Sequence, residues 1–236
     1  MIKKAPVLSL KEVTKKFGQE EVLNSVSFDL NSGEFAFLVG PSGSGKTTLF
    51  RVLSREIPLT SGEIMFLDKE ISGRLSGRQI VWLRRQIGRV FQDLKLIGDR
   101  TIRENIEISF DIFDFPHQEL EEILELVGLE NRADLFPAQL SEGEKQRAGI
   151  ARALIYRPKV LLVDEPTSNL DPASSWQIIN LLKKVNQEGT AVIIATHNED
   201  IVDSLKMRVI EIEKGKIIRD EADSQYQSNP EEKGKE

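Results

Sequence analysis

The sequence contains no cysteine among its 236 residues. Disulfide bonds and thiolate metal sites are therefore excluded, and a cytosolic setting is expected. Hydrophobic runs are short, and those at residues 160–163 and 191–195 fall far below the roughly 20 apolar residues that a membrane-spanning helix needs. The lysines near the N-terminus are not followed by the apolar segment of a signal peptide. We therefore expect any role at a membrane to depend on a partner protein.

The sequence also has few aromatic residues and no excess of positive charge. Aromatic residues make up 6% of the chain, and 32 basic against 38 acidic residues give a formal net charge of -6. This balance argues against a general nucleic-acid-binding protein. Hydrophobic residues still make up 39% of the chain, which is enough for a sizeable core. The length predicts one large domain, or one domain with an inserted subdomain.

The most informative segment is a glycine-rich stretch at residues 40–48, with the sequence GPSGSGKTT. It lies between an expected strand at 35–39 and an expected helix from residue 49. Glycines let the backbone approach an anion closely, and backbone N–H groups and the helix start then face phosphate groups. Lys46 adds a full charge for the outer phosphates, and the Thr47 hydroxyl suits Mg²⁺. An ordinary Gly/Ser turn is less favoured, because it does not account for the preceding strand and the Lys-Thr pair.

Two further buried strands are expected to end in polar residues. The run at 160–163 is followed by Asp164 and Glu165, and the run at 191–195 is followed closely by His197. The carboxyl ends of parallel strands form the ligand-binding edge of an α/β sheet. Asp164, read alone as a turn or cap residue, is therefore expected to bind Mg²⁺ or to support a residue that does, and Glu165 to act as a base or to position water. For His197, a catalytic role and a structural or exposed role remain equally open.

Other positions give weaker signals. Phe17 lies in an expected turn at 15–20, where it is either an exposed loop aromatic or a stacking face for a base. From its local sequence alone, Gln92 is expected to be an ordinary surface glutamine. Ser141 and Glu144 have the spacing of a capping box, which predicts a helix from about residue 142 to residue 156.

Periodicity predicts most of the remaining elements. Strands are expected near 8–13, 26–30 and 63–67, helices at 80–87, 120–127 and about 176–185, and a hairpin at 209–218. Residues 71–78 are polar with two glycines and are predicted to form a loop. Residues 221–236 are polar without periodicity and are predicted to form a disordered tail.

In order and spacing, six short motifs resemble those of ABC-type ATPases over nearly the whole chain. They are Gly40–Thr48 (Walker A), Gln92 (Q-loop), Leu140–Glu144 (signature), Val160–Glu165 (Walker B), Asn169–Asp171 (D-loop) and His197 (switch histidine). One motif alone would be a weak signal, whereas all six in this order are very specific. Segments mostly outside the motifs resemble the cell-division branch of this family, chiefly 54–58, 83–88, 91–93, 196–198 and 201–203, and also 208–210 and 214–220.

The resemblance implies an α/β fold, with a P-loop NTPase (RecA-like) core, an N-terminal antiparallel β subdomain and an inserted α-helical subdomain. It implies a single ATPase domain at residues 1–220, with the helical subdomain at about 93–158, before the tail at 221–236. It also implies that the protein binds ATP and Mg²⁺ and hydrolyses ATP to ADP and phosphate.

The resemblance also assigns roles to individual residues. Glu165 would polarise the attacking water, His197 would hold the γ-phosphate, and Gln92 would reach Mg²⁺ and sense the γ-phosphate. The implied metal ligands are Thr47, Gln92 and Asp164. The implied nucleotide contacts are Phe17 on the adenine, Val22, Ser42, Gly43, Ser44, Gly45, Lys46, Thr47, Thr48, Gln92, Ser141, Gly143, Glu144 and Asp171.

A second copy of the chain is an implied partner. Two ATP molecules would lie between the copies, each with Walker motifs from one copy and the signature from the other. The helix start at Ser141 would then serve as an anion site for the other copy's phosphates. Glu142 departs from the family pattern, which usually has glycine there. A carboxylate suits a helix start but would repel a γ-phosphate, so we predict that the Glu142 side chain points away from the nucleotide.

The implied membrane partner is a transmembrane protein of the FtsX type, whose cytoplasmic helix would dock near residues 92–105. The output would be control of cell-wall hydrolases in cell division, from a cytoplasmic position, peripheral on the inner face of the plasma membrane, with no direct membrane insertion and no nucleic-acid partner. The alternative is the ATPase subunit of a lipoprotein-release or macrolide-export transporter. A soluble ABC protein acting on ribosomes or DNA is disfavoured, because those usually carry two ATPase domains or a long coiled coil.

Overall fold

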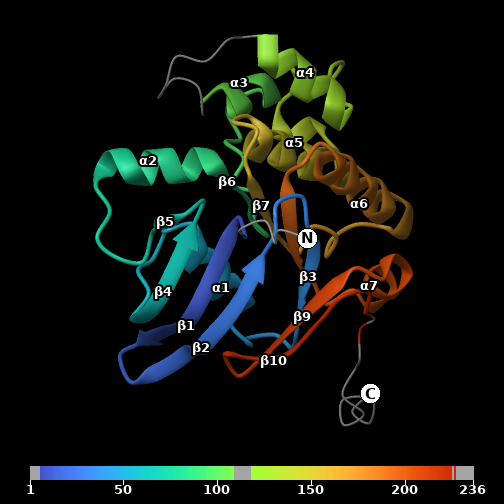
Figure 1. Cartoon of the computed structure of the whole chain (residues 1–236). Helices are drawn as coiled ribbons and strands as arrows, with labels where there is room; N and C mark the ends of the chain where they lie inside the picture. The colour runs from blue at the N-terminus through green and yellow to red at the C-terminus, as the bar shows by residue number, and fades with distance from the viewer. Residues whose placement is uncertain (1–5, 109–117, 225, 227–236) are drawn as a thin grey trace.

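The computed structural model describes residues 6–108, 118–224 and 226 of the chain. These residues form two β-sheets with helices packed between and around them (Figure 1). Parallel strands that alternate along the chain with helices are the arrangement of an α/β protein. The predicted fold class is therefore confirmed.

The larger sheet has six strands in the order β10-β9-β3-β8-β7-β6. β3 pairs in parallel with β8 and β9, β7 pairs in parallel with β6 and β8, and β10 adds an antiparallel edge. Every residue of β3, β7 and β8 is buried, as expected of parallel strands covered on both faces. The strands span Phe35–Val39 (β3), Ile87–Val90 (β6), Val160–Asp164 (β7), Ala191–Ala195 (β8), Arg208–Glu213 (β9) and Lys216–Glu221 (β10).

The smaller sheet is antiparallel and comes from the N-terminal part of the chain, in the order β2-β1-β4-β5. Its strands span Leu8–Phe17 (β1), Glu20–Leu30 (β2), Ser61–Phe66 (β4) and Lys69–Glu70 (β5). Helix α1 (Lys46–Leu53) buries Leu49 and Phe50 in a core that the two sheets share. This packing anchors α1, whose first turn adjoins the glycine-rich loop.

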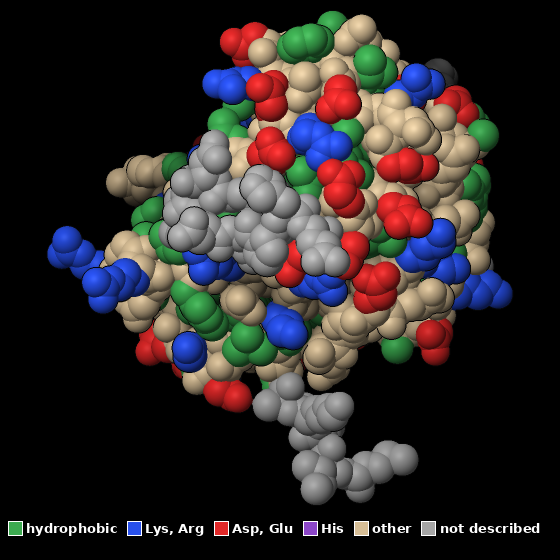
Figure 2. Space-filling view, turned by 90° about the horizontal axis from the view of Figure 1, so that it is seen from above, with side chains coloured by type: hydrophobic (Ala, Val, Ile, Leu, Met, Phe, Trp, Pro, Cys, Tyr) green, Lys and Arg blue, Asp and Glu red, His purple; other side chains and the backbone are tan. Residues whose placement is uncertain are grey.

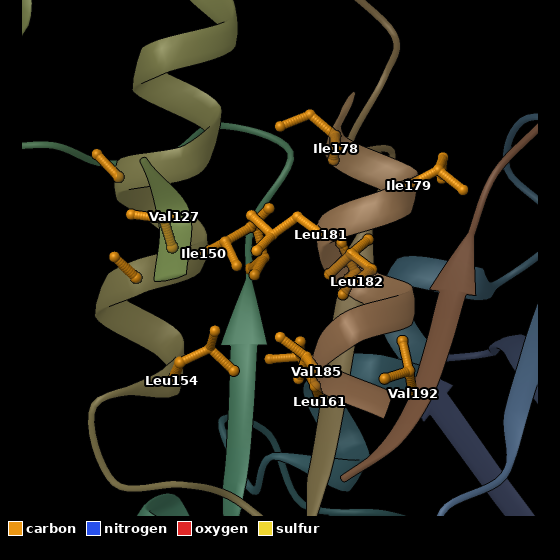
Figure 3. Packing of buried hydrophobic residues seen from close by; sticks show 14 of the residues in the cluster. Val127, Ile150, Leu154, Leu161, Ile178, Ile179, Leu181, Leu182, Val185 and Val192 are labelled. Atoms are coloured by element: carbon orange, nitrogen blue, oxygen red, sulfur yellow. The ribbon is translucent and has the colours of Figure 1, made fainter. Parts of the chain in front are cut away.

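Helices cover the other face of the larger sheet. They are α5 (Glu142–Leu154) and α6 (Pro172–Gln187), and α4 (Gln118–Val127) packs against α5. Ile150 of α5 and Leu181 of α6 lie in one buried cluster with Leu161 of β7 and Val192 of β8 (Figure 3). Each fully buried side chain of this kind contributes roughly 1.5–3 kcal/mol relative to leaving it exposed. The cluster therefore fixes the strands whose ends carry the polar residues of interest.

The described residues between β6 and β7 form helices and loops. They include α3 (Ile102–Glu107), α4, a short 3-10 helix (Pro137–Gln139) and α5, and α3 and α4 lie with α5 at the top of Figure 1. α5 contacts both α3 and α4. A helical insertion at this place agrees with the prediction, whereas its limits at about 93 and 158 stay a prediction. Elsewhere, α2 (Gly77–Gln86) precedes β6 and α7 (Glu199–Leu205) follows β8.

The surface seen from above mixes acidic and basic side chains rather than gathering one sign of charge (Figure 2). In the parts of the chain that the structure describes, no helix is both long enough and apolar enough to cross a membrane.

Three local predictions were wrong in their limits. The turn predicted at 15–20 is only Gly18–Gln19, because β1 runs on to Phe17 paired with β2, and cross-strand pairing outweighs the polar local sequence. The loop predicted at 71–78 already contains the start of α2, whose N-cap is Ser76. The helix predicted to reach residue 156 ends at Leu154.

The predicted tail at 221–236 also begins too early. Glu221 is the last residue of β10, and Tyr226 packs against the core that contains α5 and α6. The backbone N–H of Tyr226 donates to Oδ1 of Asp203 at 2.5 Å. Residue 225 and residues 227–236 lie outside the described residues.

Candidate functional site

A cleft of about 730 Å³ lies at the carboxyl ends of β3, β7 and β8. Because these strands run in parallel, segments far apart in the sequence meet at this one edge of the sheet. The predicted site residues that line the cleft are Val22, Ser42, Gly43, Ser44, Gly45, Lys46, Thr47, Thr48, Gln92, Asp164, Glu165 and His197. Most of the residues predicted for phosphate and metal binding are therefore brought together within one chain.

The glycine-rich loop is pressed against the C-terminal hairpin. Gly40 has φ 140°, and a Cβ atom at this position would lie 2.1 Å from the carbonyl oxygen of Ile212, so only glycine fits. The N–H of Gly215, in the turn between β9 and β10, donates to the carbonyl oxygen of Ser44 at 3.0 Å. The loop leads directly into α1 at Lys46, so the positive end of that helix adjoins the cleft. The arrangement is suited to binding phosphate groups.

Lys46 places its ammonium group inside the loop. Its Nζ donates to the carbonyl oxygens of Gly40 at 2.6 Å and Pro41 at 3.0 Å. Burial lowers the pKa of Lys46, while the carboxylates of Glu165 and Asp164 act in the opposite direction. The ammonium group is therefore held against the loop backbone. Phosphate oxygens of a bound ligand can replace the two carbonyl oxygens as its partners, because the hydrogen bonds that they form with it are stronger.

Asp164, the last residue of β7, is the most buried carboxylate of the cleft, with 2% of its surface exposed. Its Oδ1 is buried and has no hydrogen-bond partner among the described residues. Burial raises the pKa of Asp164, and the Thr47 hydroxyl and the Arg89 guanidinium oppose this effect. Burying a carboxylate oxygen without a partner costs free energy, and a bound cation would offset that cost.

Thr47, Gln92 and Asp164 all line the cleft and all carry a side-chain oxygen. Mg²⁺ prefers oxygen ligands and is commonly held by one or two carboxylates together with substrate phosphates and water. Within the described ranges, no cluster of three or more His, Cys, Asp or Glu side chains is placed to hold a metal by itself. The residues therefore fit Mg²⁺ that arrives with a phosphate ligand, and not an all-protein metal site.

Glu165 and His197 meet across the ends of β7 and β8. Nδ1 of His197 lies 2.9 Å from Oε2 of Glu165, with the histidine side chain 67% exposed and the glutamate 11% exposed. Glu165 has φ 48°, an uncommon backbone conformation for a residue other than glycine and one that recurs at functional sites. Its N–H is held by the carbonyl oxygen of Ala195 at 2.8 Å. The pair sets a carboxylate within the cleft and an imidazole at its rim.

A family model described as ABC transporter matches residues 23–168, which is more than half of the chain and includes the glycine-rich loop, Gln92 and the Asp164-Glu165 pair. The chain belongs to the ABC transporter family. As an ABC ATPase it binds and hydrolyses ATP, as the motifs predict.

Relatives of this ABC ATPase match it over most of its length. FtsE of Streptococcus pneumoniae, a cell division ATP-binding protein, is 41% identical over 225 residues, which cover 93% of this chain and 97% of FtsE. MetN of Geobacillus kaustophilus, a methionine import ATP-binding protein, is 38% identical, and the match covers 90% of this chain and 64% of MetN. The solved dimer of the ATP-binding cassette MJ0796 with ADP and Pi, in a post-hydrolysis state, gives a TM-score of 0.82 at 32% identity and covers 93% of this chain and 100% of that one. The predicted resemblance, including that to the cell-division branch, is confirmed.

The signature and D-loop residues of this ABC ATPase do not line the cleft described above, although Glu142, Asn169 and Leu170 line a neighbouring hollow that shares Gln92 and Glu165 with it. Ser141 caps α5, since its Oγ accepts from the N–H of Glu144 at 3.3 Å and the Glu144 carboxylate accepts from the N–H of Ser141 at 2.8 Å. Gly143 is buried beside Ser174, and Asp171 caps α6 by accepting the N–H of Ser174 at 3.0 Å. The predicted capping box is confirmed. None of the described residues that line the cleft comes from the signature or the D-loop.

Phe17 is also outside the set that lines the cleft. The side chain stands at the end of β1, is 45% exposed, and has Nζ of Lys15 4.8 Å from its ring centroid. Its stacking on a base stays a prediction.

Two residues that line the cleft were not identified from the sequence, Glu199 and Tyr226. Glu199 begins α7, two positions after His197, and this proximity was a usable signal. Tyr226 follows β10, within a stretch that looks like a polar tail. Only the return of the chain past Asp203 brings it to the cleft.

Proposed function

We propose that this chain is an FtsE-like ATPase subunit that couples ATP-driven closure of a homodimer to a transmembrane partner of the FtsX type, which regulates cell-wall hydrolysis in cell division. The observation that carries the proposal is a nucleotide site in two halves. The cleft contains the phosphate loop, Asp164 and Glu165, while the capped helix start at Ser141 lies elsewhere. The match to nearly the whole of FtsE, in contrast to part of MetN, supports the choice of complex.

In the proposed site, backbone N–H groups of residues 42–48 and the ammonium group of Lys46 hold the ATP phosphates. Thr47, Gln92 and Asp164 hold Mg²⁺, which when bound neutralises charge on the phosphate oxygens. Val22, which lines the cleft, packs beside the adenine, and the exposed ring of Phe17 stacks on it.

Hydrolysis in this proposal depends on the pair at the strand ends. Glu165 orients and polarises the water that attacks the γ-phosphate, and His197 holds the γ-phosphate from the rim of the cleft. Gln92 reports the presence of the γ-phosphate to the segment that follows it. Because the transition state of phosphoryl transfer is loose, positioning and charge neutralisation contribute most of the rate enhancement.

The second half of each site comes from the other copy. Ser141, Gly143, Glu144 and Asp171 face the ATP bound by the partner, and the start of α5 supplies backbone N–H groups to its γ-phosphate. Support comes from the solved MJ0796 dimer with ADP and Pi. The Glu142 carboxylate lies 2.6 Å from Nζ of Lys145 in the same helix, which supports the proposal that its charge is directed away from the nucleotide.

The membrane partner docks beside the segment after Gln92. A hollow of about 620 Å³ is lined by residues 92–96, by Pro137 and Ala138, by Glu142, Lys145 and Gln146, and by residues 165 and 168–170. Arg152 of α5 fixes the 92–96 side of this hollow, because its guanidinium donates to the carbonyl oxygens of Leu94 and Lys95. A helix of an FtsX-type partner seated between here and residue 105 would place this chain in the cytoplasm, on the inner face of the plasma membrane.

The test is affinity capture with a hydrolysis-deficient variant. Glu165→Gln is expected to accumulate as an ATP-bound dimer and to retain an FtsX-type membrane protein from solubilised membranes, whereas the matched surface variant Glu188→Gln is expected to retain much less. Recovery of a lipoprotein-release or macrolide-export subunit instead would favour the alternative. A Glu165→Gln protein that stays monomeric with Mg-ATP, even with its captured membrane partner, would contradict the shared site.

A further inference from the structure

Arg89 is a buried cation with no part in the proposed binding or hydrolysis of ATP. It lies in β6, beside β7, and its side chain is only 7% exposed. The Nη1 group forms an ion pair with Glu56 and lies 3.4 Å from the Ser54 hydroxyl, both in the segment that follows α1. The Nη2 group lies 4.0 Å from Oδ2 of Asp164.

The guanidinium also packs over an aromatic ring. Its central carbon lies 4.5 Å from the ring centroid of Phe91, which immediately precedes Gln92. One side chain therefore touches the chain just after α1, the end of β7, and the residue before Gln92. Asp164 and Gln92, two of the three residues proposed to hold Mg²⁺, lie at or directly after these contacts, whereas Thr47, the third, lies in the first turn of α1, at the other end of that helix from Ser54 and Glu56.

We propose that Arg89 is a positioning residue for the Mg²⁺ site, which holds the Asp164 carboxylate from behind through Oδ2 and leaves Oδ1 for the metal. The inference rests on the proposed function, since it takes the Mg²⁺ site as given. Oδ1 is the buried carboxylate oxygen that lacks a hydrogen-bond partner among the described residues, so the two oxygens of Asp164 have different surroundings.

The chemistry of arginine suits this place better than that of lysine. A planar guanidinium has donors on separate nitrogens, so Nη1 can stay on Glu56 while Nη2 faces Asp164. A lysine has a single ammonium nitrogen on a flexible stem and would have to choose between the two carboxylates. Glu56 supplies a second negative charge on the other side of the guanidinium. The Arg89 side chain is therefore held at a fixed distance from Asp164 and does not form a closer ion pair with it.

The test measures metal binding directly. The protein is loaded with a fluorescent ATP analogue in EDTA, and buffered free Mg²⁺ is then titrated while the fluorescence of the bound nucleotide is followed. In Arg89→Met, the Mg²⁺ concentration for half of the change is expected to rise at least tenfold, while the affinity for the analogue in EDTA stays within about twofold of wild type. Arg89→Lys is expected to recover only part of the loss, and Arg84→Met, an exposed arginine nearby, to behave as wild type.

Other outcomes separate this inference from the function on which it rests. If Asp164→Asn raises the Mg²⁺ requirement and Arg89→Met leaves it within twofold of wild type, the role of Arg89 is wrong and the Mg²⁺ site stands. If Asp164→Asn also leaves the requirement unchanged, the proposed Mg²⁺ site itself is wrong. Should Arg89→Met fail to fold, as judged by circular dichroism, Arg89→Gln decides instead, because it can still donate to Glu56 but carries no charge toward Asp164.

Discussion

Nδ1 of His197 lies 2.9 Å from Oε2 of Glu165, although the imidazole is exposed and the carboxylate is enclosed. The two residues follow neighbouring parallel strands, and the N–H of Glu165 is held by the carbonyl oxygen of the last residue of β8. A movement of the loop after β8 therefore reaches both side chains at once. The side-chain contact thus joins the rim of the cleft to its interior.

His197→Ala is expected to lower kcat for ATP hydrolysis by about 10²-fold, at the lower end of the range for loss of a positioned proton donor or acceptor. The KM for ATP should change less than about threefold, because the phosphate loop is untouched. Phosphate release measured with the membrane partner present checks both values. Asp200→Asn, a change at an exposed position of α7, is the control, and equal rates for the two variants would contradict the role of His197.

Ser141→Arg is expected to abolish hydrolysis while ATP binding by single subunits stays within about twofold of wild type, because Ser141 lies outside the cleft of its own chain. The added side chain would obstruct only the site shared with a second copy. Lys46→Ala, in contrast, is expected to lose both binding and hydrolysis. Titration with a fluorescent ATP analogue and a steady-state assay measure the two properties, and loss of ATP binding in folded Ser141→Arg monomers would refute the two-half site.

Gly40→Ala is expected to reduce the free energy of unfolding by about 3 kcal/mol or more, since both the positive φ and the Ile212 carbonyl oppose a side chain. Gly98→Ala is the matched control, because a Cβ atom there would meet nothing within 4 Å. Its effect should be below about 0.5 kcal/mol. Urea unfolding of the two variants gives the comparison.

Asp164→Asn is expected to stabilise the protein in the absence of nucleotide, with a gain that depends on pH. Burial raises the pKa of Asp164 above its ordinary value of 3.8, so the folded state binds the proton more tightly than the unfolded state. Stability contributed by this group is then fully present below pH 3.8 and is lost as pH rises through the folded pKa. Asparagine does not ionise, so the variant does not lose this stability as pH rises.

The measurement for Asp164→Asn is the difference in Tm between variant and wild type as pH is raised from about 4.5 to 8. It should grow to a few degrees, because about 1 kcal/mol shifts Tm by roughly 2–4 °C in a chain of this size. Asp223→Asn, which changes an exposed carboxylate, should show no such trend. A difference that shrinks with rising pH would overturn the assignment.

The sequence was informative wherever a local pattern and a topological rule coincide. The strands at 35–39, 160–163 and 191–195 are recognisable because fully buried parallel strands are apolar throughout. The carboxyl ends of such strands share one edge of the sheet, and this rule alone predicts Asp164 close to the phosphate loop. Ser141 as a helix cap followed from its spacing to Glu144. Each of these patterns spans only a few residues, so it can be recognised from the sequence alone.

What the sequence concealed depends on contacts between distant segments. Arg89 looks like a surface arginine beside a short strand, and only the fold sets it between Glu56 and Asp164. β1 extends through the polar residues 15–16 to Phe17 because β2 pairs with it there, and Tyr226 reaches the cleft because the chain returns past α7. No local propensity encodes such contacts.

The hydrogen bond from Gly215 to Ser44 has a consequence for biosynthesis. Residues 40–48 emerge from the ribosome long before the turn that braces them, which lies between β9 and β10. Chains fold from the N-terminus during synthesis, at about 5–20 residues per second, so the loop must wait roughly ten seconds or more for its support. A nascent chain, or one truncated before β9, would therefore carry the whole phosphate-binding motif and still be a poor binder of ATP, which ties competence for nucleotide to synthesis of the β9–β10 hairpin.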